Sequence, residues 1–338
     1  MSFPSVRLPG GWCEGWESNP QASRRWNLNP VRLPIPPPSL EASGIPIRCH
    51  YTAEVRLLRI VTGRISLWNQ RLPSGHYENF PVASWLLPPV LREPVALIYR
   101  FARSADDIAD EGEASRDQRL AGLAAYGAEL DRIEARAEPR TPLFRELARA
   151  VHRHALPIAL FRDLLSAFAQ DVVKPRYADF AELLAYCRRS ANPVGRLLLQ
   201  LFGRTERIAL ERSDDICTSL QLTNFWQDVA LDWAKGRVYL PQDEMRRFGV
   251  TENQIAQGEC NAAWRALMQY QCERARNLMF AGAPLARTLE GRVALEIGVT
   301  IQGGLRILEK LAHSGYDVFR QRPLLGVSDW PLLVWRAL

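Results

Sequence analysis

The chain has 338 residues, 47% of them hydrophobic and 24% charged, which is typical of a globular protein and excludes a disordered one. The net charge is +6, but the arginines are scattered and form no dense basic block, so nucleic-acid binding is not expected. The six cysteines form no C-x-x-C pair and no metal-binding spacing, which indicates reduced, mostly buried thiols. No apolar run approaches the roughly 18 residues of a membrane-spanning helix. We therefore expect a soluble, cytoplasmic protein.

Residues 1–50 differ in texture from the rest of the chain. They contain many prolines, including Pro36, Pro37 and Pro38, and they show no helical periodicity. Dense prolines remove backbone donors and prevent a packed helix, so we expect a disordered or weakly ordered leader. An upstream start codon chosen in error would produce the same kind of segment.

From about residue 75 the pattern becomes helical. Ala, Leu, Glu and Arg recur with helical spacing in eight segments, which are 116–136, 142–154, 157–172, 179–190, 193–203, 206–233, 260–280 and 290–313. Thr251 followed by Gln254 is a capping-box pattern that predicts the start of a short helix. The sequence has no alternating strand patterns bounded by hairpin turns. These observations predict one all-α domain over residues 75–338.

The first acidic cluster lies in the segment 100–110. On a helix, Asp106, Asp107, Asp110 and Arg103 would share one side. Carboxylates one turn apart repel each other unless a cation sits between them, and Mg²⁺ takes a few carboxylate oxygens together with water and phosphate. A solvated acidic face, or neutralisation of Asp106 and Asp107 by Arg103, explains the pattern equally well. This cluster alone therefore leaves both interpretations open.

The second acidic cluster is more informative, because the segment 221–235 is apolar except for one stripe. The polar side chains fall within an arc of about 80°, and they are Gln221, Asn224, Asp228, Asp232 and Lys235. Burial of several unpaired carboxylates is very costly, whereas a surface helix should have a broad polar face. The stripe therefore favours a metal site. The acidic pair Asp214–Asp215 lacks this context and is interpreted as solvated.

The two clusters are about 120 residues apart, far enough to lie on different helices of a bundle and face each other across a cavity. Metals held from both sides would clamp a diphosphate and stabilise it as a leaving group. The carbocation left behind would need an aromatic pocket. The candidates are Phe80, Trp85, Phe101, Phe225 and Trp226, each of which is individually more typical of plain core.

Four motifs in order resemble those of the squalene/phytoene synthase family, and the resemblance covers about residues 75–320. They are N-F-P-V-A-S-W-L-L-P (79–88), Y-R-F-A-R-x-x-D-D-x-x-D (99–110), Y-C-x-x-x-A-x-x-V-G (186–195) and Q-L-x-N-x-x-x-D-V-x-x-D with G-R-V-Y-L-P (221–241). The resemblance implies a single-domain isoprenoid synthase bundle of helices with a central active-site cavity. It also implies a prenyl diphosphate as the substrate and Mg²⁺ as the cofactor.

The resemblance assigns roles to individual residues. The catalytic carboxylates would be Asp106, Asp107, Asp110, Asp228 and Asp232. The Mg²⁺ ligands would be Asp106, Asp110, Asn224, Asp228 and Asp232. The substrate would be bound by Arg103, Gln221, Asn224, Arg237, Tyr239, Phe80 and Tyr186.

Two departures from the family pattern narrow the expected reaction. Many members that condense two prenyl diphosphates carry basic residues where this chain has Glu78 and Gln227. With H-Y-E-N-F-P (76–81) and D-W-P (329–331), the chain looks most like the hopanoid-pathway HpnC branch, which resembles a hydroxysqualene synthase. That branch implies conversion of presqualene diphosphate to hydroxysqualene in squalene and hopanoid biosynthesis. Water captures the cation, so no reductive step is implied and NADPH is not expected.

Three alternatives follow from the same residues. A complete squalene or phytoene synthase would condense two prenyl diphosphates. A non-catalytic assembly factor on the same fold would not need the carboxylates, all of which are present. A head-to-tail prenyltransferase or terpene cyclase also uses D-D-x-x-D, but the second motif fits neither. Peripheral contact with the inner face of the membrane and transient contact with neighbouring squalene-pathway enzymes stay open as predictions.

Overall fold

The computed structural model describes residues 86–338. The regular secondary structure in this range consists of helices and one isolated parallel bridge between Arg176 and Val238. The first helices are α2 (Pro89–Asp110), α3 (Arg116–Glu134), α4 (Pro142–His154), α5 (Ile158–Val173), α6 (Phe180–Ser190) and α7 (Asn192–Leu201). They are followed by α8 (Arg207–Ala234), α9 (Gln242–Phe248), α10 (Glu252–Gln257), α11 (Ala262–Gly282), α12 (Gly291–His313) and α13 (Trp330–Ala337). Two short 3-10 helices, Ala283–Thr288 and Val327–Asp329, complete the set. The all-α prediction is confirmed.

The helix boundaries agree closely with those expected from sequence. All eight predicted segments are helices, and each boundary lies within two residues of the prediction. The predicted capping box also forms, because Thr251 Oγ1 accepts a bond from the backbone N–H of Gln254 and Gln254 Oε1 accepts one from that of Thr251. Helices α9 and α13 were not predicted, since both are short and periodicity is weak over so few residues. The leader, together with the candidate residues Glu78, Phe80 and Trp85, lies outside the described residues.

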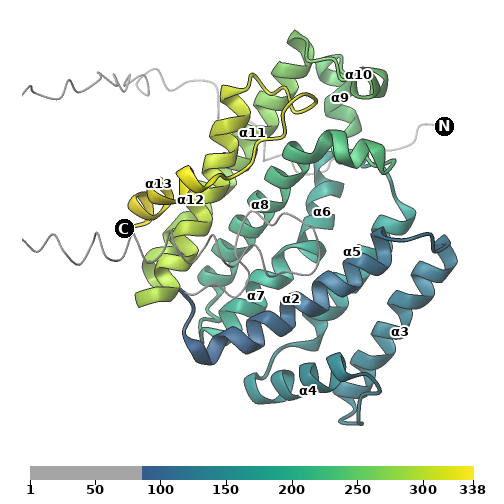
Figure 1. Cartoon of the computed structure of the whole chain (residues 1–338), viewed down its shortest axis with the longest axis vertical. Coiled ribbons are helices and arrows are strands. Elements are labelled where there is room, and N and C mark those ends of the chain that lie inside the picture. The colour runs from purple at the N-terminus through teal and green to yellow at the C-terminus, as the bar shows by residue number, and fades with distance from the viewer. Residues whose placement is uncertain (1–85) are drawn as a thin grey trace, which may run out of the picture. The chain divides into compact units, whose positions relative to one another are not determined.

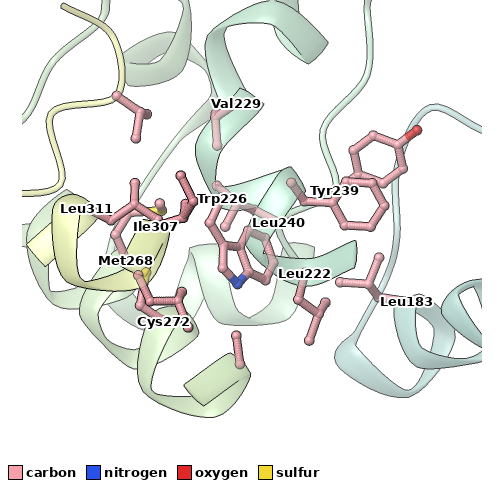
Figure 2. Close-up of a cluster of buried hydrophobic side chains, with 14 of the residues drawn as sticks. Leu183, Leu222, Trp226, Val229, Tyr239, Leu240, Met268, Cys272, Ile307 and Leu311 are labelled. Carbon is pink, nitrogen blue, oxygen red and sulfur yellow. The ribbon is translucent and has the colours of Figure 1, made fainter. Parts of the chain in front are cut away.

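Helix α8 lies in the middle of the bundle, with α6, α7, α11 and α12 packed around it (Figure 1). Its residue Trp226 is completely buried. In Figure 2, Met268, Cys272, Ile307 and Leu311 from α11 and α12 lie to the left of Trp226, Val229 lies above it and Leu222 lies to its lower right. Because burial of one large aromatic contributes a few kcal/mol, this core fixes the rotation of α8 and hence the direction of its polar stripe.

A second core is built from α2, α3, α4 and α5 around Phe101, which is also completely buried. The Phe101 ring meets Phe144 and Phe161 edge to face, with centroids 5.9 and 5.1 Å apart. Phe101 and Trp226 are therefore core residues, and their burial fixes the orientation of the two helices that carry aspartates.

Close contact between α7 and α8 depends on Gly195. A Cβ atom there would lie 2.5 Å from Cys217 Sγ and closer still to Ser213 Oγ. Only glycine lets the two helices approach this far, which explains the small residue at the end of the third motif.

Two further sequence expectations concern compartment and thiols. In residues 86–338 no helix has the length and apolar character needed to cross a membrane. The four described cysteines are free thiols; Cys187 and Cys272 are buried, whereas Cys217 and Cys260 are partly exposed.

Candidate active site

The first cluster occupies the last two turns of α2, where the predicted face forms. Arg103 lies beside two of its carboxylates, with its terminal nitrogens 2.7 Å from Asp107 and 3.5 Å from Asp106. It also donates to Glu111 at 2.9 Å. Arg103 thus neutralises part of the acidic face, which agrees with the interpretation that this arginine pairs with Asp106 and Asp107. Asp107 and Asp106 keep 40% and 37% of their side-chain surface exposed, so they remain open to a ligand.

Asp110 makes different contacts and is much more enclosed, with 12% of its side chain exposed. It accepts two hydrogen bonds from the Arg237 guanidinium and one from Lys235 Nζ at 3.0 Å. Burial opposes ionisation, but the Arg237 hydrogen bonds and the two positive charges hold the pKa of Asp110 below its usual value. Lys235 and Arg237 directly follow α8, the helix that carries the second cluster. These ion pairs therefore bring the two clusters to the same site.

The second cluster consists of one paired and one unpaired carboxylate. Asp228 is bound by both Nε and a terminal nitrogen of Arg322, which lies between α12 and α13. Asp232 forms no ion pair with any residue in the described part of the chain. Burial, reinforced by repulsion from Asp228 and Asp110, raises the pKa of Asp232 to about 8.

The first cluster also contains an aspartate with a raised pKa. Burial, together with repulsion from Asp110, raises the pKa of Asp106 to about 6, although Arg103 partly offsets the shift. Each cluster thus holds one aspartate whose ionisation is disfavoured, although Asp106 lies 3.5 Å from Arg103 whereas Asp232 has no ion pair within residues 86–338. The repulsion between Asp232 and Asp110 shows that α2 and α8 present their carboxylates toward each other. A cation placed among them would relieve that repulsion.

The donor set fits Mg²⁺. Across residues 86–338 no group of three or more His, Cys, Asp or Glu side chains is arranged to hold a metal unaided. Mg²⁺ seldom uses such an all-protein cage, since it is usually bound by one or two carboxylates and completed by water and substrate phosphate. Carboxylates in pairs on two facing helices match that pattern.

The remaining predicted side chains of the stripe lie on the same face of α8 as Asp228. Gln221 is partly exposed and Asn224 is exposed, so both are accessible to a ligand. Gln227 behaves differently, because it is 1% exposed and donates to the carbonyl oxygen of Pro323 inside the protein. Position 227 therefore does not face the site, and the guanidinium beside Asp228 comes from Arg322. Sequence reasoning missed Arg322 because it lies in a loop without periodicity.

Tyr186 and Tyr239 lie close together at the inner side of the site, and a further carboxylate holds them. Asp171, near the end of α5, accepts a hydrogen bond from Tyr186 Oη at 2.6 Å and another from Tyr239 Oη at 3.1 Å. Burial raises the pKa of Asp171 to about 7, although the Tyr186 hydrogen bond opposes this shift. No motif pointed to Asp171, because a single aspartate in an ordinary helix gives no signal; only the fold brings it to the tyrosines.

A pocket of about 460 Å³ opens beside Asp110. Basic residues dominate its charged lining, which comprises Arg116, Arg119, Lys174, Lys235 and Arg237 with Asp110 and Asp171. A pocket with this surplus of positive charge favours an anionic ligand next to the carboxylates.

The acidic pair used as a contrast is only partly solvated. Asp214 keeps 21% of its side chain exposed and is held by Arg196 through two hydrogen bonds of 2.9 and 2.6 Å. A salt bridge between the neighbouring helices α7 and α8 explains this aspartate without a ligand.

Comparison with known proteins shows the family to which this all-α bundle belongs. The sequence profile of the squalene/phytoene synthase family matches residues 74–329, and the chain belongs to that family. Hydroxysqualene synthase from Rhodopseudomonas palustris is 36% identical over 236 residues, covering 69% of this chain and 79% of the relative. The 15-cis-phytoene synthase from Synechococcus elongatus is 28% identical over 265 residues, covering 75% of this chain and 85% of the relative.

A solved structure gives the same result. The crystal structure of squalene synthase HpnC from Alicyclobacillus acidocaldarius superimposes with a TM-score of 0.67 at 35% identity. The match covers 77% of this chain and 96% of that one. The chain is therefore an isoprenoid synthase of the kind that processes prenyl diphosphates.

Proposed function

We propose that this enzyme converts presqualene diphosphate to hydroxysqualene with release of diphosphate, in a Mg²⁺-dependent reaction of squalene and hopanoid biosynthesis. The observation that carries a diphosphate reaction is the meeting of Asp106 and Asp110 with Asp228 and Asp232, two of which resist ionisation without an added cation. The similarity to hydroxysqualene synthases supports the particular substrate and product.

Mg²⁺ would be held by Asp106, Asp110, Asn224, Asp228 and Asp232. Bound there, it would supply Lewis acidity that stabilises the negative charge on the departing diphosphate. Arg237 and Lys235 would then exchange their carboxylate partner for diphosphate oxygens, because they stand at the edge of the basic pocket. Arg103 and Arg322 would hold the carboxylates of α2 and α8 in place.

Ionisation breaks the carbon–oxygen bond to the diphosphate, which leaves with the electron pair. The cyclopropylcarbinyl cation rearranges, and the oxygen of one water molecule forms the new carbon–oxygen bond and loses a proton. The stacked rings of Tyr239 and Phe225, whose centroids are 3.8 Å apart, would form an aromatic wall that stabilises a cation at the inner side of the site. The sum is presqualene diphosphate plus water to hydroxysqualene plus diphosphate, with no electron transfer.

A second candidate is a complete squalene or phytoene synthase that condenses two prenyl diphosphates. It is favoured by the guanidinium of Arg322 beside Asp228, which supplies positive charge where the sequence at position 227 has none. Similarity to a 15-cis-phytoene synthase also supports it, at lower identity.

The test is to incubate the purified full-length chain with Mg²⁺ and either presqualene diphosphate or farnesyl diphosphate, and to identify the products by mass spectrometry. We expect the alcohol hydroxysqualene from presqualene diphosphate and no turnover of farnesyl diphosphate. Consumption of farnesyl diphosphate alone, or a hydrocarbon product, would instead establish the second candidate.

A further inference from the structure

One carboxylate outside both aspartate clusters uses both of its oxygens to hold tyrosines. Asp171 Oδ2 accepts from Tyr186 Oη and Oδ1 accepts from Tyr239 Oη. The three residues come from α5, from α6 and from the segment after α8. Tyr186 is 3% exposed and Tyr239 is 7% exposed, so water does not compete for these bonds.

The two tyrosines connect Asp171 to the second cluster. Tyr239 stacks on Phe225 with an angle of 8° between the rings, and Tyr186 lies 6.0 Å from the same ring. Phe225 is on α8, one turn before Asp228. The position of Phe225 therefore depends on where Asp171 holds the two phenols.

The same segment also connects Asp171 to the first cluster. Arg237, which binds Asp110, is two residues before Tyr239, so one short stretch of backbone carries both contacts. Asp171 and Asp110 line the same pocket. A shift of Tyr239 would move Arg237 relative to Asp110.

Asp171 has no ion pair of its own among residues 86–338, where its bonds are those with the two tyrosines. A carboxylate enclosed in this way costs free energy that an apolar side chain would not. Packing of α5 against its neighbours does not require an acidic side chain at position 171. An aspartate there can instead accept hydrogen bonds from two hydroxyls at once.

We propose that Asp171 is a positioning residue, which fixes the hydroxyls of Tyr186 and Tyr239 and thereby the aromatic wall that faces the carbocation. Asp171 acts through the tyrosines, because both of its carboxylate oxygens accept hydrogen bonds from their hydroxyls. The inference rests on the proposed function only in that a prenyl diphosphate is ionised at this site. The role proposed for Asp171 is the same whether the substrate is presqualene diphosphate or farnesyl diphosphate.

The experiment is a double-mutant cycle on the full-length chain, measured as steady-state diphosphate release with saturating Mg²⁺. The variants are Asp171→Asn, Tyr186→Phe with Tyr239→Phe, and all three substitutions together. We expect Asp171→Asn to lower kcat about 10- to 100-fold, as loss of an outer-shell partner does at metal sites. KM should change less than about threefold, because substrate contacts are intact.

The second half of the cycle separates this role from a merely structural one. In the variant that already carries Tyr186→Phe and Tyr239→Phe, Asp171→Asn should lower kcat by less than about threefold, because substitutions of residues that contact each other are not additive. An equal loss of kcat in both backgrounds would overturn the proposal, as would wild-type kcat in Asp171→Asn.

Controls address folding and substrate. Asp131→Asn, on an aspartate of α3 whose side chain is 69% exposed, should leave kcat and KM unchanged. Far-UV circular dichroism and Tm are recorded for every variant, and if Asp171→Asn does not fold, the same cycle and criteria apply to Asp171→Glu. If the wild-type chain consumes farnesyl diphosphate instead of presqualene diphosphate, the proposed function fails, whereas the cycle run with farnesyl diphosphate still decides the role of Asp171.

Discussion

The two aspartate clusters differ in where their neutralising cations come from. In the first, Arg103 of the same helix pairs with Asp106 and Asp107, and Lys235 and Arg237 reach Asp110 from beyond α8. In the second, the only ion pair within the described residues comes from Arg322 of the C-terminal loop, and Asp232 is left unpaired. The first cluster is therefore partly neutralised by the protein itself, whereas the second depends more on an added cation.

The largest effect should come from the two carboxylates whose pKa is raised. Asp232→Asn and, to a lesser extent, Asp106→Asn should lower the rate of diphosphate release by about 10³-fold, since metal-assisted charge stabilisation is worth several kcal/mol. Steady-state assays check this, with Asp215→Asn on the outer part of α8 as a control that keeps wild-type activity. Equal or greater loss in Asp106→Asn than in Asp232→Asn would remove the difference between the clusters.

The cations of the two clusters should also differ in their importance for stability. Arg237 and Asp110 have 13% and 12% of their side chains exposed, whereas Arg322 and Asp228 have 29% and 23%. Arg237→Gln should lower the free energy of unfolding by about 2–3 kcal/mol, because it removes the two Arg237 hydrogen bonds to the buried Asp110 carboxylate and leaves that of Lys235. Arg322→Gln should cost only about 1 kcal/mol, as for more exposed pairs. Urea denaturation measures both, and the reverse order would contradict the burial argument.

A substitution that only disturbs packing should separate stability from chemistry. Gly195→Ala places a Cβ against Ser213 and Cys217 and should cost about 1–3 kcal/mol through overpacking between α7 and α8. At a temperature where the variant is folded, its dependence on Mg²⁺ concentration should match the wild type. Thermal unfolding and Mg²⁺ titrations of activity test the two halves. A shifted Mg²⁺ midpoint would mean that this contact positions the second cluster directly.

A further effect is a pH dependence of metal-free stability. The pKa values of Asp232 and Asp106, about 8 and about 6, lie above the ordinary 3.8, so the folded state binds these protons more tightly than the unfolded chain. Their contribution to stability is complete below pH 4 and is lost as pH rises through 6 and then 8.

Tm of the metal-free protein should therefore fall between pH 4 and pH 8, by about 2–4 °C for each kcal/mol lost. Asp232→Asn should remove the part of the fall that lies above pH 6. Differential scanning calorimetry measures this, and a Tm that rises over the same interval would show that the carboxylates are not held as described.

Sequence patterns located most of the fold because the helices are long and strongly periodic. They also located both aspartate clusters, since Asp106 and Asp110, and Asp228 and Asp232, are one helical turn apart. They did not reveal Arg322 or Asp171, whose partners lie 94 residues away in one case and 15 and 68 in the other. Such contacts arise from tertiary packing between residues far apart in the sequence, so they produce no local sequence pattern. Gln227 was misread for the same reason, because its burial depends on the loop that carries Pro323.

The most direct measurement is the rate of diphosphate release from presqualene diphosphate as a function of Mg²⁺ concentration, starting from protein treated with a chelator. The two facing clusters predict no release without Mg²⁺ and a saturable rise when it is added, with the curve displaced to higher concentration in Asp232→Asn. Undiminished release in the presence of excess chelator would contradict the metal role of both clusters.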